Sequence, residues 1–227
     1  MSYSCRVVLV DDHAVVRAGI KLLIELTERY RVVGEASSGE AAIARVAALE
    51  PDLVVMDIRM PGMDGIAATR RIVKRHPDVR VLVLTAYDEP EYVEAVIEAG
   101  AMGCLSKRRA RSDLVGALDT VAAGRMTFPA HVVGLLSSAW SASQVQSDGL
   151  ASVSEREREI LFLTAAGYTA EEVSRKVHLS PKTIANYRTS LKAKLGIQTR
   201  ADLMRAVVES GHLADMLKAA GFDRADV

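Results

Sequence analysis

Five polar residues stand directly after short aliphatic runs, and together they can bind a cation and take up a phosphoryl group. Asp11 and Asp12 follow VVLV, Asp57 follows LVVM, Thr85 follows VLVL, and Lys107 follows GCLS. Three carboxylates brought together repel one another unless a hard cation neutralises them, and Mg²⁺ prefers such oxygen ligands. With Mg²⁺ and Lys107 offsetting the charge, Asp57 can attack a phosphoryl group. Thr85 can then donate its hydroxyl to a phosphoryl oxygen.

The elements that must bring these residues together follow from the hydrophobic pattern. Aliphatic runs alternate with amphipathic stretches, which predicts strands at 6–10, 31–36, 53–56, 80–84 and 103–106 and helices at 15–26, 40–48, 66–76, 90–99 and 112–123. Near-continuous hydrophobic strands are typical of a parallel sheet with helices on both faces. Ligands bind beyond the carboxyl ends of the strands in such doubly wound folds. A single aspartate there usually caps a helix, but the complete set favours a phosphoryl site.

A strongly basic stretch near the C-terminus is the second candidate for function. Between Arg175 and Arg200 there are seven positive charges and no Asp or Glu. Residues from 180 onward have helical periodicity, with Ile184 and Leu191 on the face that would be buried. Asn186 lies away from that face, where it can hydrogen-bond adenine in the DNA major groove. The alternative is an ordinary solvated basic surface.

Capping residues predict four helices in this part of the chain. The helices start at a Ser or Thr, followed by a carboxylate three residues later or by a proline: Ser154 with Glu157, Thr169 with Glu172, Ser180 with Pro181, and Thr199 with Asp202. The basic stretch is the third of these helices. We therefore expect it to be the second helix of a helix-turn-helix, the one that enters the major groove.

A chain of 227 residues is long enough for two domains. We place the first domain at residues 1–124, a Ser-rich linker at 125–150, the all-α domain at 151–213 and a tail at 214–227. Cys5 and Cys104 lack metal-ligand spacing and are expected to be free thiols. We expect no signal peptide, since the first residues contain no apolar stretch of the required length, and no later stretch reaches the ~20 residues of a membrane span. We therefore expect a cytoplasmic protein.

The motifs also carry a family resemblance. VLVDDHAVVRAGI, VVMDIRMPGMDG, VLVLTAYDE and AGAMGCLSK resemble the receiver domain of bacterial two-component response regulators. VSEREREILFLTAAGYTAEEVSRKVHLSPKTIANYRTSLKAKLGI resembles the LuxR-type domain, and the combination is similar to the NarL/FixJ family. The resemblance implies a flavodoxin-like α/β fold with a five-stranded parallel sheet of order 2-1-3-4-5, followed by a small helix-turn-helix domain of four helices.

The same resemblance implies a role for each site residue. Asp57 would accept a phosphoryl group from a sensor histidine kinase, while Asp11 and Asp12 would join Asp57 in holding Mg²⁺. Thr85 and Lys107 would sense the phosphoryl group.

For the DNA interface, the resemblance implies that Ala185, Asn186 and Thr189 read bases. Backbone contacts would come from Lys182, Thr183, Tyr187, Arg188, Lys192 and Lys194. The partners implied are double-stranded promoter DNA and a second copy of the chain once it is phosphorylated, and RNA polymerase is a further candidate. The last capped helix, from Ala201 to Val208, either packs into its own core or forms a two-fold contact between DNA-binding domains.

Two features depart from the family or extend it. Receivers commonly carry Tyr or Phe three residues before the lysine, where it moves together with the threonine, and this chain has Cys104. The resemblance therefore implies that position 104 belongs to the switch, with a smaller side chain than is common there. Arg59 and Tyr87, each two residues after a site residue, would overhang the pocket, and we hypothesise that they slow attack of water on the acyl phosphate.

Other functions compete with this interpretation. A phosphorylation-independent DNA-binding regulator would use its receiver only as a protein-docking platform. A pure docking or relay module would not need the basic helix, and a LuxR-type sensor of a small ligand would not need Asp57 and its neighbours. A conventional enzyme is not indicated, because the pocket suits uptake and slow loss of a phosphoryl group and no second substrate cleft is evident.

Overall fold

A computed structural model describes residues 5–86, 90–129, 150, 152–198 and 200–219. The chain divides into two compact units, Met1–Pro129 and Ala130–Val227. Each unit is considered by itself below. Most of the expected linker, 125–150, lies outside the described residues, as does Tyr87. Within the described part of the chain, no helix has the length and apolar character needed to cross a bilayer.

The first unit is a five-stranded parallel sheet of order β2-β1-β3-β4-β5, which confirms the doubly wound fold. Its strands are β1 (Cys5–Val10), β2 (Tyr30–Ala36), β3 (Leu53–Asp57), β4 (Arg80–Thr85) and β5 (Gly103–Ser106). Its helices are α1 (Ala14–Glu25), α2 (Gly39–Leu49), α3 (Gly65–Arg75), α4 (Pro90–Glu98) and α5 (Ala110–Ala122). The limits differ from the sequence-based ones by at most two residues.

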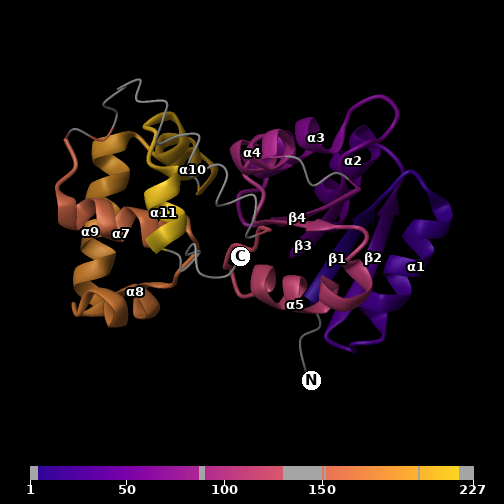
Figure 1. The fold of residues 1–227 in the computed structure, drawn as a ribbon, viewed down its shortest axis with the longest axis horizontal. Helices are drawn as coiled ribbons and strands as arrows, with labels where there is room; N and C mark the ends of the chain where they lie inside the picture. Colours follow the sequence, from indigo (N-terminus) through magenta and orange to yellow (C-terminus); the bar gives the residue numbers. More distant parts are fainter. Residues whose placement is uncertain (1–4, 87–89, 130–149, 151, 199, 220–227) are drawn as a thin grey trace. The chain divides into compact units, whose positions relative to one another are not determined.

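Helices cover both faces of the sheet, with α1 and α5 on one side and α2, α3 and α4 on the other (Figure 1). Under α1 and α5 a cluster of buried aliphatic side chains includes Leu9, Ile24, Leu53, Leu84 and Leu118. The central strands have no exposed side: every residue of β3 is buried. This packing explains the continuous aliphatic runs of the sequence, because both faces of each central strand contact helices.

One glycine sets the path of the chain below the carboxyl end of β3. Gly65 N–H donates to the carbonyl of Ile58 at 2.8 Å. A Cβ at position 65 would lie 1.8 Å from the carbonyl oxygen of Asp57, so no other residue fits without a shift. α3 begins at this glycine, and the Asp64 side chain caps it by accepting from Ala67 N–H at 2.7 Å. The loop is thereby held tightly against Asp57.

The second unit is all-helical. Its described helices are α7 (Glu155–Ala165), α8 (Ala170–Val177), α9 (Pro181–Leu195), α10 (Arg200–Glu209) and α11 (Leu213–Ala219). Both expected capping boxes form, at Ser154 with Glu157 and at Thr169 with Glu172. α9 begins after Ser180, whose hydroxyl accepts from Thr183 N–H at 3.1 Å. The four expected helices are all present.

A fifth helix, α11, lies in the expected tail, where the sequence pattern indicates a helix over 213–220. Leu213 and Met216 are fully buried, and α11 packs against α7. The packed part of the second unit therefore continues past residue 213. Single-helix periodicity could not show this, because a short amphipathic segment is stabilised by the surface it covers rather than by its own propensity.

Candidate functional site

The carboxyl ends of β1, β3, β4 and β5 bring the five predicted residues to one edge of the sheet. We call Asp11, Asp12, Asp57, Thr85 and Lys107 the carboxylate pocket. Asp11, Asp57 and Thr85 are almost completely buried, at 1%, 4% and 1% exposure. Two ionised carboxylates with so little access to water need a compensating cation.

Lys107 supplies that positive charge. Its Nζ lies 2.7 Å from Asp11 Oδ2 and 2.7 Å from Asp57 Oδ2. Burial raises the pKa of Asp57 above its ordinary value, although the hydrogen bond and charge of Lys107 act against that rise. Burial would lower the pKa of Lys107, but its hydrogen bonds to Asp11 and Asp57 outweigh burial and raise it. Lys107 therefore stays protonated beside the acceptor.

The donor set fits a hard divalent cation. Asp11, Asp12, His13 and Asp57 each offer a ligand atom within 4.8 Å of the others. Asp12 Oδ1 is buried and has no well-aligned hydrogen bond, although His13 Nδ1 lies 2.7 Å from it. Carboxylate oxygens in this number suit Mg²⁺, which keeps several waters and takes the rest of its ligands from the protein.

Two residues beside the pocket were missed by sequence reasoning. His13 lies next to both aspartates, and its backbone N–H donates to Asp11 Oδ1 at 2.8 Å. Arg17 donates from Nη1 to the carbonyl of Asp11 at 2.6 Å and from Nε to Glu35 at 3.0 Å. His13 could have been found from the sequence, because it directly follows the two aspartates. Arg17 was not predictable, because its partner Glu35 comes from β2.

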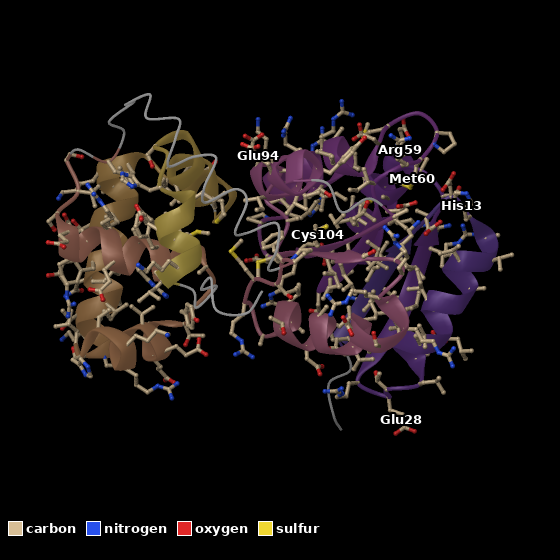
Figure 2. All side chains as sticks on the ribbon, in the orientation of Figure 1. His13, Glu28, Arg59, Met60, Glu94 and Cys104 are labelled. Carbon is tan, nitrogen blue, oxygen red and sulfur yellow. The ribbon has the colours of Figure 1, made fainter. Side chains whose placement is uncertain are left out.

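The loop after β3 carries a contact to α4. Arg59 Nη2 donates to the hydroxyl of Tyr92 at 3.0 Å. Figure 2 shows Arg59 and Met60 on the same side of the unit as His13. Arg59 therefore reaches α4 from the neighbourhood of the carboxylate pocket, whereas its expected companion Tyr87 lies outside the described residues.

Cys104 is buried within β5, at 4% exposure (Figure 2). It pairs with Val83 of β4, so the two side chains point to the same face of the sheet. That face is opposite to the cluster that contains Leu82 and Leu84. The small thiol thus occupies a core position, consistent with its status as a free cysteine.

In the second unit, α9 exposes most of the predicted DNA-facing side chains. Exposed residues are Lys182, Ala185, Asn186, Thr189, Lys192 and Lys194, and Thr183 and Tyr187 are half-buried. Ile184 and Leu191 are buried on the opposite face. The helix therefore presents small and amide side chains, flanked by lysines, on one surface.

Two of the residues predicted to contact the DNA backbone make side-chain contacts within their own domain. Arg188 is half-buried: its Nε donates to Thr164 Oγ1 at 3.1 Å, and its Nη2 donates to the carbonyl of Tyr168. Lys194 Nζ pairs with Glu157 at 2.8 Å. These contacts fasten α9 to α7 and to the loop that follows α7.

Apolar side chains of α10 are buried in the core of the same unit. Leu203, Met204 and Val207 are buried, at 8%, 3% and 0% exposure. Core packing, the first of the two alternatives, therefore accounts for these three. Position 201, where the expected surface begins, lies in α10, but its side chain is not among those described.

Comparison with known families matches both units. The response regulator receiver domain matches residues 7–119, and the luxR family of bacterial regulatory proteins matches residues 151–207. The response regulator UvrY of Escherichia coli K12 is 36% identical over 205 residues, which cover 90% of this chain and 94% of UvrY. The response regulator GacA of Pseudomonas aeruginosa is 34% identical over 206 residues, covering 91% and 96%.

Solved structures agree with this result. The Salmonella typhimurium response regulator RcsB is 29% identical, with a TM-score of 0.56 over 92% of this chain and 99% of RcsB. A structure of the RcsB–DNA complex matches equally well, with a TM-score of 0.56 over 91% of this chain.

Proposed function

Since the chain belongs to the NarL/FixJ-type response regulators, which join a receiver domain to a LuxR-type DNA-binding domain, we propose that Asp57 accepts a phosphoryl group from a sensor histidine kinase. We further propose that this modification controls dimerisation and promoter binding. The observation that carries the proposal is the pair of 2.7 Å contacts from Lys107 to Asp11 and Asp57, which places a partly buried ammonium beside a buried acceptor.

The residues of the pocket divide the work of phosphoryl transfer. A carboxylate oxygen of Asp57 attacks phosphorus, the P–N bond of a kinase phosphohistidine breaks, and its electron pair stays on the imidazole nitrogen. Mg²⁺, held by Asp11, Asp12 and Asp57, would offset negative charge on the transferring group. Lys107 offsets the same charge from the protein side, and its position is preorganised by the two carboxylates.

Thr85 connects the pocket with the rest of the domain. It ends β4 and pairs with Ser106, the last residue of β5, and its carbonyl accepts from Lys107 N–H at 2.7 Å. A phosphoryl group on Asp57 adds a strong acceptor that the Thr85 hydroxyl and the Lys107 ammonium can both reach for. Such contacts favour one conformation over the other, which is the requirement for a switch.

In DNA binding, α9 would enter the major groove and turn Ala185, Asn186 and Thr189 toward the bases. Lys182, Thr183, Tyr187 and Lys192 would contact the sugar–phosphate backbone. Two copies of the domain would read inverted half-sites, as expected for a two-fold dimer. Arg188 and Lys194 instead would hold α9 in place. The division into two domains, a cytoplasmic location and a contact with RNA polymerase belong to the same proposal.

Intact-mass spectrometry after incubation with acetyl phosphate tests the first step. We expect a gain of one phosphoryl group that requires Mg²⁺ and is absent in Asp57→Asn. Asp78→Asn is a matched control, because Asp78 is exposed and lies outside the pocket. Uptake that persists in Asp57→Asn would remove Asp57 from this role.

The second step needs a DNA probe. Duplexes selected by the phosphorylated protein from a random-sequence pool should bind more weakly to Asp57→Asn, as measured by fluorescence anisotropy. Equal binding with and without the phosphoryl group would favour the alternative, a phosphorylation-independent regulator whose receiver is a docking platform.

A further inference from the structure

The chain returns to the sheet after α5 and pairs with the edge strand. Thr127 N–H donates to the carbonyl of Met102 at 3.0 Å, and Cys104 N–H donates to the carbonyl of Thr127 at 2.9 Å. Gly103 and Thr127 form a parallel bridge. We call residues 126–128 the edge segment. It lies within the region that the sequence suggested to be linker, and it satisfies backbone groups that β5 would otherwise leave unpaired.

Gly103 is what permits this close approach. A Cβ at position 103 would lie 2.6 Å from Thr127 Cγ2 and 2.8 Å from the Thr127 carbonyl oxygen. A side chain there would therefore push the edge segment away from β5. The sequence thus keeps a residue without a side chain at the point where the edge segment joins the sheet.

The same strand carries the carboxylate pocket at its other end. Ser106, the last residue of β5, pairs with Thr85, and Lys107 N–H donates to the carbonyl of Thr85. A shift of the Lys107 backbone toward a phosphoryl group would move the end of β5, to which it is directly joined. Because a short strand moves as one piece, the backbone groups that bind Thr127 move with it.

Phe128 follows the bridge and is the buried aromatic residue of the edge segment. Gly103 stands opposite Thr127 in the parallel bridge, so Cys104 and Phe128 are the next residues along the two chains. Both are buried, at 4% and 5% exposure. Pro129 follows, and since proline has no N–H to donate, it ends the pairing at the limit of the first compact unit.

We propose that the edge segment transmits the state of the carboxylate pocket to the chain that leads toward the DNA-binding domain, with Phe128 as its positioning residue. A shift of β5 on phosphorylation moves Thr127 through the two backbone hydrogen bonds and moves the buried Phe128 side chain together with it. This proposal rests on the proposed function, because it supplies the path between phosphoryl uptake and DNA binding.

Gly103→Ala is the sharpest test, since it adds one methyl group at the junction and changes no pocket side chain. Gly116→Ala is its matched control, because a Cβ at position 116 of α5 has no neighbour within 4 Å. Phe128→Ala and Phe128→Leu form a second pair, in which leucine keeps buried bulk. For each variant, acetyl phosphate uptake is followed by intact mass, and DNA affinity is measured with and without the phosphoryl group, using the selected duplex.

We expect phosphoryl uptake at the wild-type rate in every variant. The ratio of DNA affinities between the two states should fall toward one in Gly103→Ala and Phe128→Ala, recover partly in Phe128→Leu and stay unchanged in Gly116→Ala. A full DNA response in Gly103→Ala and Phe128→Ala would overturn the proposal. Loss of uptake in these variants would also overturn it, because the edge segment would then support the pocket rather than transmit its state.

A measurement that needs no phosphoryl group separates this proposal from the proposed function. Lys107→Ala, as a single substitution, should change the hydrogen-exchange rates of the Thr127 and Cys104 amides relative to the wild-type protein. Unchanged protection at both amides would overturn the coupling, whether or not Asp57 accepts a phosphoryl group. Altered protection in a protein that takes up no phosphoryl group would support the coupling while refuting the proposed function.

Discussion

Lys107 Nζ lies 2.7 Å from Asp57 Oδ2, and a second carboxylate, that of Asp11, is equally close to the same ammonium. The lysine thus bridges two buried acids in the resting protein. A cation that binds these acids must share them with Lys107, and a phosphoryl group on Asp57 must draw the ammonium away from one of them. The position of Lys107 is therefore sensitive to every step at this pocket.

Replacing Lys107 with alanine should separate these two effects. Phosphoryl uptake from acetyl phosphate should slow by about 100-fold, the cost of removing one preorganised donor from a site of charge development. Affinity for Mg²⁺ should rise, because the ammonium no longer competes for Asp11 and Asp57. Intact-mass kinetics and calorimetric titration measure the two quantities. Lys74→Ala, on the exposed surface of α3, should change neither; weaker Mg²⁺ binding in Lys107→Ala would contradict the competition.

Arg59 should control how long the phosphoryl group persists. Its hydrogen bond to Tyr92 holds the guanidinium over the loop after β3, at 3.0 Å from the hydroxyl. Arg59→Ala should shorten the half-life of the aspartyl phosphate by about tenfold, equivalent to roughly 1.4 kcal/mol in the barrier to hydrolysis. Tyr92→Phe should have a smaller effect in the same direction. After the phosphoryl donor is removed, intact-mass spectrometry measures the loss of the phosphoryl group over time. An unchanged half-life in Arg59→Ala would exclude this role.

The receiver could be predicted because the residues that mark its strands and its site are neighbours in the sequence. Strands β1, β3 and β4 contain near-continuous aliphatic runs, and Asp11, Asp57 and Thr85 directly follow them. The sheet order came from the family resemblance rather than from periodicity. The edge segment was missed because its two hydrophobic residues, Met126 and Phe128, are too few to indicate a strand. Its pairing depends on the absent side chain of Gly103, a relationship that exists only in three dimensions.

The DNA-binding unit shows a different limit. Helical periodicity correctly separated Ile184 and Leu191 from the exposed surface of α9. It could not decide the direction of a long side chain, since an arginine stem can lie along either face. Arg188 turns inward because Thr164 and the carbonyl of Tyr168 offer acceptors, and both come from elsewhere in the sequence.

Arg188→Ala should therefore weaken the fold of the DNA-binding unit. Loss of hydrogen bonds from a half-buried charged group should cost about 2 kcal/mol of stability. Hydrogen exchange of α9 peptides in the full chain measures this locally. Thr164→Val, which removes one acceptor, should give a part of the same loss. Unchanged protection of α9 in Arg188→Ala, together with weaker DNA binding, would return Arg188 to the set of phosphate contacts.

Lys182 and Asn186 should affect DNA binding in different ways. Lys182→Ala should weaken binding to all duplexes alike and reduce the slope of log affinity against log salt by about one. Asn186→Ala should cost about 1–3 kcal/mol at the preferred base pair and relax specificity there, with little change in the salt slope. Anisotropy titrations at several salt concentrations, with matched and mismatched duplexes, distinguish the two. A steeper salt effect for Asn186→Ala would reverse the assignment.

Glu157 should make the DNA-binding unit sensitive to acid. The hydrogen bond from Lys194, followed by those from the Ser154 backbone N–H and hydroxyl, lowers the pKa of Glu157 from 4.5 to about 2. Because the folded-state pKa is the lower one, its ionised form stabilises the fold above pH 4.5, and this contribution is lost as the pH falls toward 2. Glu157→Gln should reduce hydrogen-exchange protection of α7 at pH 7.

The difference between Glu157→Gln and the wild type should shrink as the pH falls through that window, because the wild-type carboxyl then also becomes neutral. Glu155→Gln is the matched control, since Glu155 is exposed in the same first turn of α7. Lys194→Met should reproduce most of the loss at neutral pH, because it removes the largest cause of the lowered pKa. A penalty for Glu157→Gln that is the same at pH 7 and pH 3 would show that the carboxylate charge is not what stabilises this helix start.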